Sequence, residues 1–263
     1  MIEDSSGSPT LTNVATRRAA ESLIEALALR TRRASAQLVL GLDFALTYPE
    51  EVALKLSSVA GSAGPTGTHL AHWLWALLDE LIIDEPSNLN NRIAVADVLN
   101  EQLSEPLFWG LPSGCGNQSA DTTHGNVSRR QLPTTLPRFR RCDQLASLAV
   151  KGFISSPFQL FGAGAVGSQS LLGMAMLGRL ERRIGPIDLW PYERSGAPIV
   201  AVEVWPTLHV SKPISVHLDG GIKDQTQVEQ CVIELSSTWT HHDVQCSDLT
   251  RIPCDGWIFG LEK

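Results

Sequence analysis

Two carboxylates are the first candidates for chemistry, because each stands at the end of an apolar run typical of a buried strand. Asp43 lies in the run QLVLGLDF, and Glu203 lies in the run APIVAVEVWP. A carboxylate inside a core is costly unless it is paired, hydrogen-bonded or bound to a cation. If the two strands are neighbours, the acids either repel each other or share a cation. For Asp43, the alternative is a carboxylate that accepts amide hydrogens from the next turn.

Three further charged residues stand where predicted elements begin. Asp255 opens the short apolar piece DGWIFG, while Lys223 and Asp224 open a predicted helix over 224–235. Acidic residues at such positions can either cap a helix or contribute to a site. The sequence alone leaves both roles open.

A second kind of candidate site is an anion-binding helix start. Asn91 and Arg92 begin a predicted helix over 91–103, and the positive end of a helix dipole can hold an anion. Ordinary capping by Asn91 explains the same pattern, and we favour it.

The segment FQLFGAGAVGSQSLLGMAMLGRL contains a glycine motif. Gly162, Gly164 and Gly167 fit the pattern G-x-G-x-x-G, and a helix is predicted over 168–183. In a dinucleotide-binding fold, an acid about twenty residues later contacts the ribose, and Asp188 stands near that place.

The context of the motif favours a structural turn over a dinucleotide site. The preceding run SSPFQLF carries Pro157 and Gln159, which are unusual in a buried parallel strand. We therefore interpret the glycines as a turn that lets a helix pack closely, and we do not expect NAD to bind. A non-catalytic protein that holds a nucleotide or another anion at residues 162–167 is the alternative function.

The composition indicates a globular chain of 263 residues, 43% of them hydrophobic. The formal charge of -7 provides no overall basic field for nucleic acid, and the basic cluster of residues 129–141 is typical of a solvated face. Five cysteines without a C-x-x-C pair favour a reducing compartment, and no stretch has the character of a membrane span. We predict a cytoplasmic protein.

The hydrophobic periodicity predicts one α/β domain over residues 1–263, with a long helical and loop insertion at about 60–137. We expect a central buried strand over 37–44, and further strands over 187–190 and 199–205. Helices are predicted over the following segments: 16–33, 69–83, 91–103, 168–183 and 224–235, with another that starts at Pro49.

Eight segments in this order resemble an uncharacterised group of bacterial proteins with a ribonuclease H-like fold, some of them labelled as cobalamin-biosynthesis proteins. The segments are LVLGLDFALTYP, SNLNNRIAVADVLN, FWGLP, FQLFGAGAVGSQSLLGMAMLGRL, DLWPYE, VAVEVWPTL, IKDQTQV and DGWIFG. The resemblance covers most of the chain from about Thr16. It implies a mixed sheet with helices on both faces and carboxylates that converge at strand ends.

In active members of that superfamily, such acids hold two divalent ions for phosphoryl displacement. The resemblance therefore implies that Mg²⁺ or Mn²⁺ binds to Asp43, Glu203 and Asp255, in a hydrolase or nuclease that acts on phosphodiesters. Asp224 would supplement these acids in catalysis. Polar residues in the matching segments would contact a nucleic acid or nucleotide substrate: Asn91, Arg92, Gln159 and Lys223.

The resemblance has one departure. Members of the group begin with a strand that carries an Asp-Trp motif, whereas the first thirteen residues here, MIEDSSGSPTLTN, contain none. Three explanations stay open: the chain lacks that aspartate and its strand, Asp43 replaces it, or the sequence starts late. A missing strand would expose unpaired backbone, and pairing between protomers would then cover it.

Overall fold

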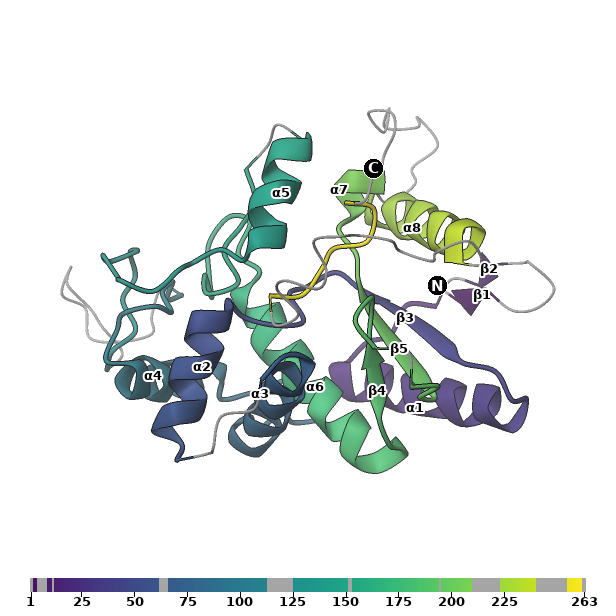
Figure 1. The fold of residues 1–263 in the computed structure, drawn as a ribbon, viewed down its shortest axis with the longest axis horizontal. Coiled ribbons are helices and arrows are strands. Elements are labelled where there is room, and N and C mark those ends of the chain that lie inside the picture. The colour runs from purple at the N-terminus through teal and green to yellow at the C-terminus, as the bar shows by residue number, and fades with distance from the viewer. Residues whose placement is uncertain are drawn as a thin grey trace.

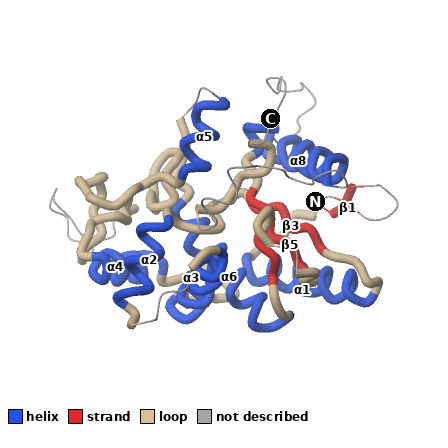
Figure 2. Tube along the Cα trace, in the orientation of Figure 1, coloured by secondary structure: helices blue, strands red, loops and turns tan. Residues whose placement is uncertain are grey.

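The computed structural model describes residues 2–3, 9–10, 12–61, 66–112, 125–150, 153–193, 195–209, 223–239 and 255–261, which form an α/β fold (Figure 1). The described strands are β1 (Ile2–Glu3), β2 (Pro9–Thr10), β3 (Leu38–Leu42), β4 (Ile187–Leu189) and β5 (Ile199–Glu203). The described helices are α1 (Arg17–Arg33), α2 (Glu50–Val59), α3 (Thr68–Leu81), α4 (Arg92–Leu103), α5 (Arg141–Val150), α6 (Gly167–Ile184), α7 (Pro206–His209) and α8 (Lys223–Trp239). Helices make up most of the regular structure (Figure 2).

The main described sheet has three parallel strands in the order β3-β5-β4. The central strand is β5, whose five residues are all buried, as expected for a parallel strand covered on both faces. The prediction of β3 as the central strand is wrong for the described sheet, where β3 lies at the edge. The apolar run of β3 does not distinguish a central strand from an edge strand, because an edge strand covered by helices is also apolar.

Alternate residues of the strands face two separate cores. Leu40 and Ala201 belong to the larger core, to which α1, α3 and α6 contribute. Val39 and Val202 belong to the second core, formed with α8 and the C-terminal segment 257–261. The sheet therefore lies between two layers, with α1 and α6 on one side and α8 on the other (Figure 1).

The predicted helices are confirmed to within a few residues, and α3 and α6 pack closely against each other. A Cβ atom at Gly178 of α6 would lie 2.3 Å from the carbonyl oxygen of Trp75 in α3, so only glycine allows this approach. Gly173 likewise leaves room for the ring of Phe44. The predicted insertion thus includes a helix, α3, that lies directly on α6.

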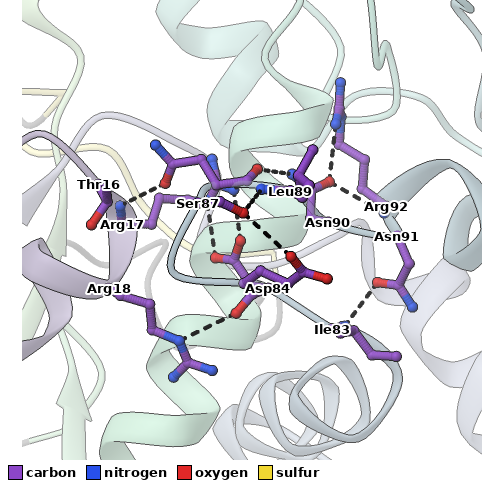
Figure 3. Close-up of polar contacts among 12 residues, drawn as sticks. Thr16, Arg17, Arg18, Ile83, Asp84, Ser87, Leu89, Asn90, Asn91 and Arg92 are labelled. Carbon is purple, nitrogen blue, oxygen red and sulfur yellow. Dashed lines mark hydrogen bonds and ion pairs between the residues drawn. The ribbon is translucent and has the colours of Figure 1, made fainter.

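Ion pairs fasten α1 to the loop after α3 (Figure 3). The guanidinium of Arg17 donates two hydrogen bonds to the buried Asp84, at 2.8 and 2.6 Å. Glu21, also buried, accepts a hydrogen bond of 3.1 Å from Arg179 of α6. These contacts join three segments that are distant in sequence.

A histidine joins α3, α6 and the turn after β4. His72 Nδ1 lies 3.0 Å from Glu181 Oε1, and His72 Nε2 lies 2.9 Å from Glu193 Oε2. Burial alone would lower the pKa of His72, but the two carboxylates outweigh it and raise that pKa to about 9. Burial would raise the pKa of Glu193, but the bonds from His72, Thr68 and Leu189 lower it to about 2.

This clamp should make stability depend on pH in alkaline solution. Because the pKa of His72 is higher in the folded protein, its contribution is complete below about 6.5 and is lost as the pH rises through about 9. After allowance for solvent screening, we expect His72→Gln to lower the free energy of unfolding by about 1 kcal/mol at pH 6. The difference from the wild type should disappear by about pH 10 in urea unfolding.

The matched control is His69→Gln, since His69 is exposed on the same helix. It should leave the free energy of unfolding unchanged at both pH values. A constant effect of His72→Gln across the range would mean that the ring acts through packing and not through its charge.

Candidate active site

A pocket of about 300 Å³ lies at the carboxyl ends of β3 and β5. In open parallel sheets, this edge is the usual place for ligands. Its charged lining residues come from the ends of two strands and from the start of α5: Asp43, Arg140, Asp143 and Glu203. The starts of α6 and α7 complete the wall through Gly164, Val166, Gln169, Pro206 and Thr207.

Strand register explains why two of the predicted acids meet. Leu42 of β3 pairs with Glu203 of β5, and Asp43 directly follows Leu42. Both Asp43 and Glu203 line the pocket, Asp43 with an exposed side chain and Glu203 with a buried one. The structure therefore brings these two predicted residues together at one edge of the sheet.

Glu203 has a partner that the sequence did not indicate. Its carboxylate receives two hydrogen bonds from Arg140, Nη1 to Oε2 at 2.7 Å and Nη2 to Oε1 at 2.6 Å. The amide of Leu46 donates a third, to Oε2 at 3.1 Å. Arg140 also bonds Asp143, with its Nη2 2.6 Å from Oδ1. One guanidinium therefore joins two carboxylates, and all three side chains are buried.

The electrostatics of this cluster follow from its burial. Burial lowers the pKa of Arg140, but Asp143 and Glu203 outweigh that effect and raise it well above the ordinary value. Burial raises the pKa of Glu203, and Arg140 offsets only part of that increase. The neighbouring thiol of Cys142 has a pKa raised well above its usual range by burial, so it stays protonated.

Asp255 bridges the starts of two helices. Its Oδ1 accepts a hydrogen bond of 2.9 Å from the amide of Glu50, the first residue of α2, and its Oδ2 accepts one of 3.0 Å from Arg141, the first residue of α5. A carboxylate at the positive end of a helix dipole is stabilising. Asp255 thus has a structural role, and it is not among the residues that line the pocket.

Asn91 and Arg92 bind other parts of the protein (Figure 3). Asn91 is the N-cap residue of α4, but its side chain makes no capping bond to that helix, so the favoured prediction of ordinary capping is wrong. Instead, its side chain bonds the carbonyl of Leu81 and the amide of Ile83. The guanidinium of Arg92 donates to Ser168 Oγ at 2.8 Å and to Asn90 Oδ1 at 2.9 Å. Neither residue lines the pocket. The guanidinium that does is Arg140.

The glycine turn packs closely onto its own neighbours. Gly162 and Gly164 have φ angles of 114° and 71°, which favour glycine. A Cβ at Gly167 would lie 2.7 Å from the carbonyl oxygen of Gln159, and the Gly167 amide donates to that same oxygen at 2.8 Å. Close packing therefore requires Gly167. The side-chain amide of Gln159 bonds the carbonyl of Phe161 at 3.4 Å.

The context of the turn differs from that of a dinucleotide fold. The segment before the turn forms one isolated bridge, between Gln159 and Trp109, and is not one of the described strands. Asp188 is buried, and its carboxylate accepts hydrogen bonds from the backbone amides of Gly196 and Ala197. This use of Asp188 is structural.

The remaining predicted residues are Lys223 and Asp224, together with the basic cluster of residues 129–141. Lys223 and Asp224 begin α8 as predicted, but their side chains lie outside the described part of the chain. The basic cluster separates, because Arg140 is buried among acids while Arg138 lies over the ring of Trp109, 5.0 Å from its centroid. The described arginines therefore do not form one phosphate-binding face.

One local pattern in the sequence indicates the contact between Arg140 and Asp143, although neither was a predicted site residue. Asp143 lies three positions after Arg140 and accepts its amide hydrogen at 2.8 Å, which is the spacing of a carboxylate at a helix start. The predicted helices do not include α5, so the sequence analysis does not interpret Asp143 as a residue at a helix start. No pattern in the sequence indicates Thr47. Its buried hydroxyl has no hydrogen-bond partner among the described residues, and it lies near Arg140.

The donor set fits one divalent ion better than two. Glu203 uses three of about four lone-pair positions on its carboxylate, which leaves one on Oε1. Both oxygens of Asp255 accept helix amides. Within the described residues no three acidic, histidine or cysteine side chains form a metal-binding group. Asp43 and Glu203 are the acids that could contribute to a site for one ion, because Mg²⁺ commonly uses one or two carboxylates and keeps several waters.

Comparisons with models of protein families, with curated proteins and with solved structures found no match for this chain. No helix in the described part of the protein has both the length and the apolar character of a membrane span. The fold and the pocket are therefore the basis for any functional inference.

Removal of Arg140 should reveal how much the buried pair matters. Arg140→Leu leaves Glu203 and Asp143 buried without a counter-charge, so we expect the free energy of unfolding at pH 7 to fall by about 3–5 kcal/mol. The loss should shrink as the pH is lowered, because the unpaired carboxyl groups take up protons. Urea unfolding followed by tryptophan fluorescence measures both effects.

Arg129→Leu is the control, since that side chain is exposed. It should change the free energy of unfolding by less than about 0.5 kcal/mol. An equal effect of the two substitutions would contradict the importance of the buried charge cluster.

Proposed function

We propose that this protein is a hydrolase of phosphodiesters that depends on Mg²⁺ or Mn²⁺, with a ribonuclease H-like arrangement of acids at strand ends. The observation that carries the proposal is the composition of the pocket. Among the described residues, three carboxyl groups and one guanidinium line it, and Asp43 and Glu203 come from neighbouring parallel strands.

The charge of the pocket argues for a cation. The described lining residues include three carboxyl groups and one guanidinium, that of Arg140, and this excess of acidic groups would repel a phosphate group. A divalent ion reverses that sign and lets the same pocket accept a phosphodiester. Asp43 and the remaining lone pair of Glu203 Oε1 would hold the ion. When bound, it would activate water and stabilise charge on the phosphoryl oxygens.

The opposite wall favours an anion. α6 is an 18-residue helix, and Val166 and Gln169 at its start line the pocket together with Gly164 of the glycine turn. The positive end of its dipole would attract phosphate oxygens. Arg140 is held by two acids and would keep Glu203 in place. The pocket thus provides acids for a cation beside a helix start for a phosphate.

The first test is the binding of Mn²⁺ to the whole chain, by calorimetry and by thermal unfolding. A ligand that binds only the folded protein raises the melting temperature. We expect Mn²⁺ to raise it in the wild type, and we expect Asp43→Asn to weaken Mn²⁺ binding at least tenfold by removing a charged ligand. Glu51→Gln, an exposed acid on α2, should bind Mn²⁺ like the wild type.

Two outcomes would overturn the proposal. Mn²⁺ affinity that is the same in Asp43→Asn and in the wild type would mean that the ion binds elsewhere. Phosphate binding that persists in EDTA and is lost when Gly164 is replaced by leucine would favour the alternative, a non-catalytic anion-binding protein that uses the glycine turn.

A further inference from the structure

The pocket contains a second group of side chains that the carboxylate chemistry does not use. Three aromatic residues line it: Phe44, Phe153 and Trp205. Phe44 packs against α6 at Gly173, and Trp205 packs against the second core, so both rings are held in place. An acidic pocket for a bare phosphodiester has no need of three aromatic rings.

Phe153 differs from the other two because its side chain is 84% exposed. Burial of an exposed phenylalanine ring contributes about 1.5–3 kcal/mol of favourable free energy. A flat ligand group that covers the ring of Phe153 would therefore gain affinity. Stacking of a nucleic-acid base on an aromatic side chain contributes about 1–3 kcal/mol. Phe161 is also exposed, at 49%, but it does not line the pocket.

Two glutamines beside the aromatic rings offer a means to read the edge of a base. Gln169 and Gln227 both line the pocket, and neither side chain bonds another described residue. A side-chain amide has both a donor and an acceptor, which matches the paired groups on a base edge. Gln169 lies at the start of α6, where the phosphate is expected, and Gln227 lies on α8.

We propose that the substrate is a small phosphodiester of a nucleotide whose base stacks on Phe153, with Gln169 and Gln227 as donors and acceptors for the base edge. This inference rests on the proposed function, because the phosphate of the nucleotide would occupy the metal-dependent part of the same pocket. The size of the pocket, about 300 Å³, and the formal charge of -7 favour a nucleotide-sized substrate over a polymer.

The test compares two phosphomonoester probes that differ only in the base, 5′-AMP and ribose 5-phosphate, by calorimetry in saturating Mn²⁺. Each stands for one half of the phosphodiester substrate. The wild type should bind 5′-AMP at least tenfold more tightly, since stacking contributes to one probe alone. Phe153→Leu should weaken 5′-AMP about tenfold and leave both ribose 5-phosphate and Mn²⁺ binding unchanged. Phe153→Tyr keeps the ring and should retain the affinity. Phe161→Leu is the matched control and should bind both probes like the wild type.

The outcomes separate this inference from the function on which it rests. Equal affinity for the two probes, or no effect of Phe153→Leu, would overturn base recognition even if Mn²⁺ binding still depends on Asp43. Binding of 5′-AMP that is equally tight in EDTA would overturn the metal-dependent function. Base recognition would stand in that case only if Phe153→Leu still weakened 5′-AMP.

Discussion

The rest of the pocket depends on one buried interaction, the pairing of Arg140 with Glu203 and Asp143. Charges removed from water are costly, and the cost is recovered only when the geometry satisfies their hydrogen bonds. Here both nitrogens at the end of the guanidinium bond Glu203, and the same group bonds Asp143. The start of α5 is thereby fixed against the end of β5. A displacement of either element would leave a buried charge without its partner.

The C-terminal segment completes this arrangement. Asp255 binds the starts of α2 and α5, while the amide of Phe259 bonds the carbonyl of Glu203 at 2.9 Å. Gly256 lies between Thr47 and Arg140, where a larger residue would meet both. The site is therefore built from segments near residues 43–50, 140–143, 203 and 255–261. It exists only when the chain has closed over its whole length, so local folding cannot preassemble it.

The wall of the pocket combines two opposite electrostatic environments. Carboxylates dominate the strand ends, and the start of a long helix forms another part of the wall. A cation and an anion together would satisfy both, and this argument supports the proposed metal-dependent reaction on a phosphodiester. The exposed ring of Phe153 adds an apolar surface that fits a base-bearing substrate.

Local patterns in the sequence were sufficient for much of the fold. Apolar runs predicted β3 and β5, each with an acid at its end, and helical periodicity predicted α1, α3 and α6. These features depend on residues within a few positions of each other, where side-chain spacing alone carries the information. Such local patterns do not determine that β3 lies at the edge of the described sheet.

The partners of the acids were decided only by the tertiary structure. A carboxylate in an apolar run indicates that a partner is needed, because burial of an unpaired charge is costly, but it does not identify that partner. Glu203 is paired with a residue 63 positions away, and Asp255 caps a helix that begins 205 positions before it. The path of the chain makes those choices. The sequence by itself thus determined where charge had to be compensated, and the folded chain determined that Arg140 and two helix starts compensate it.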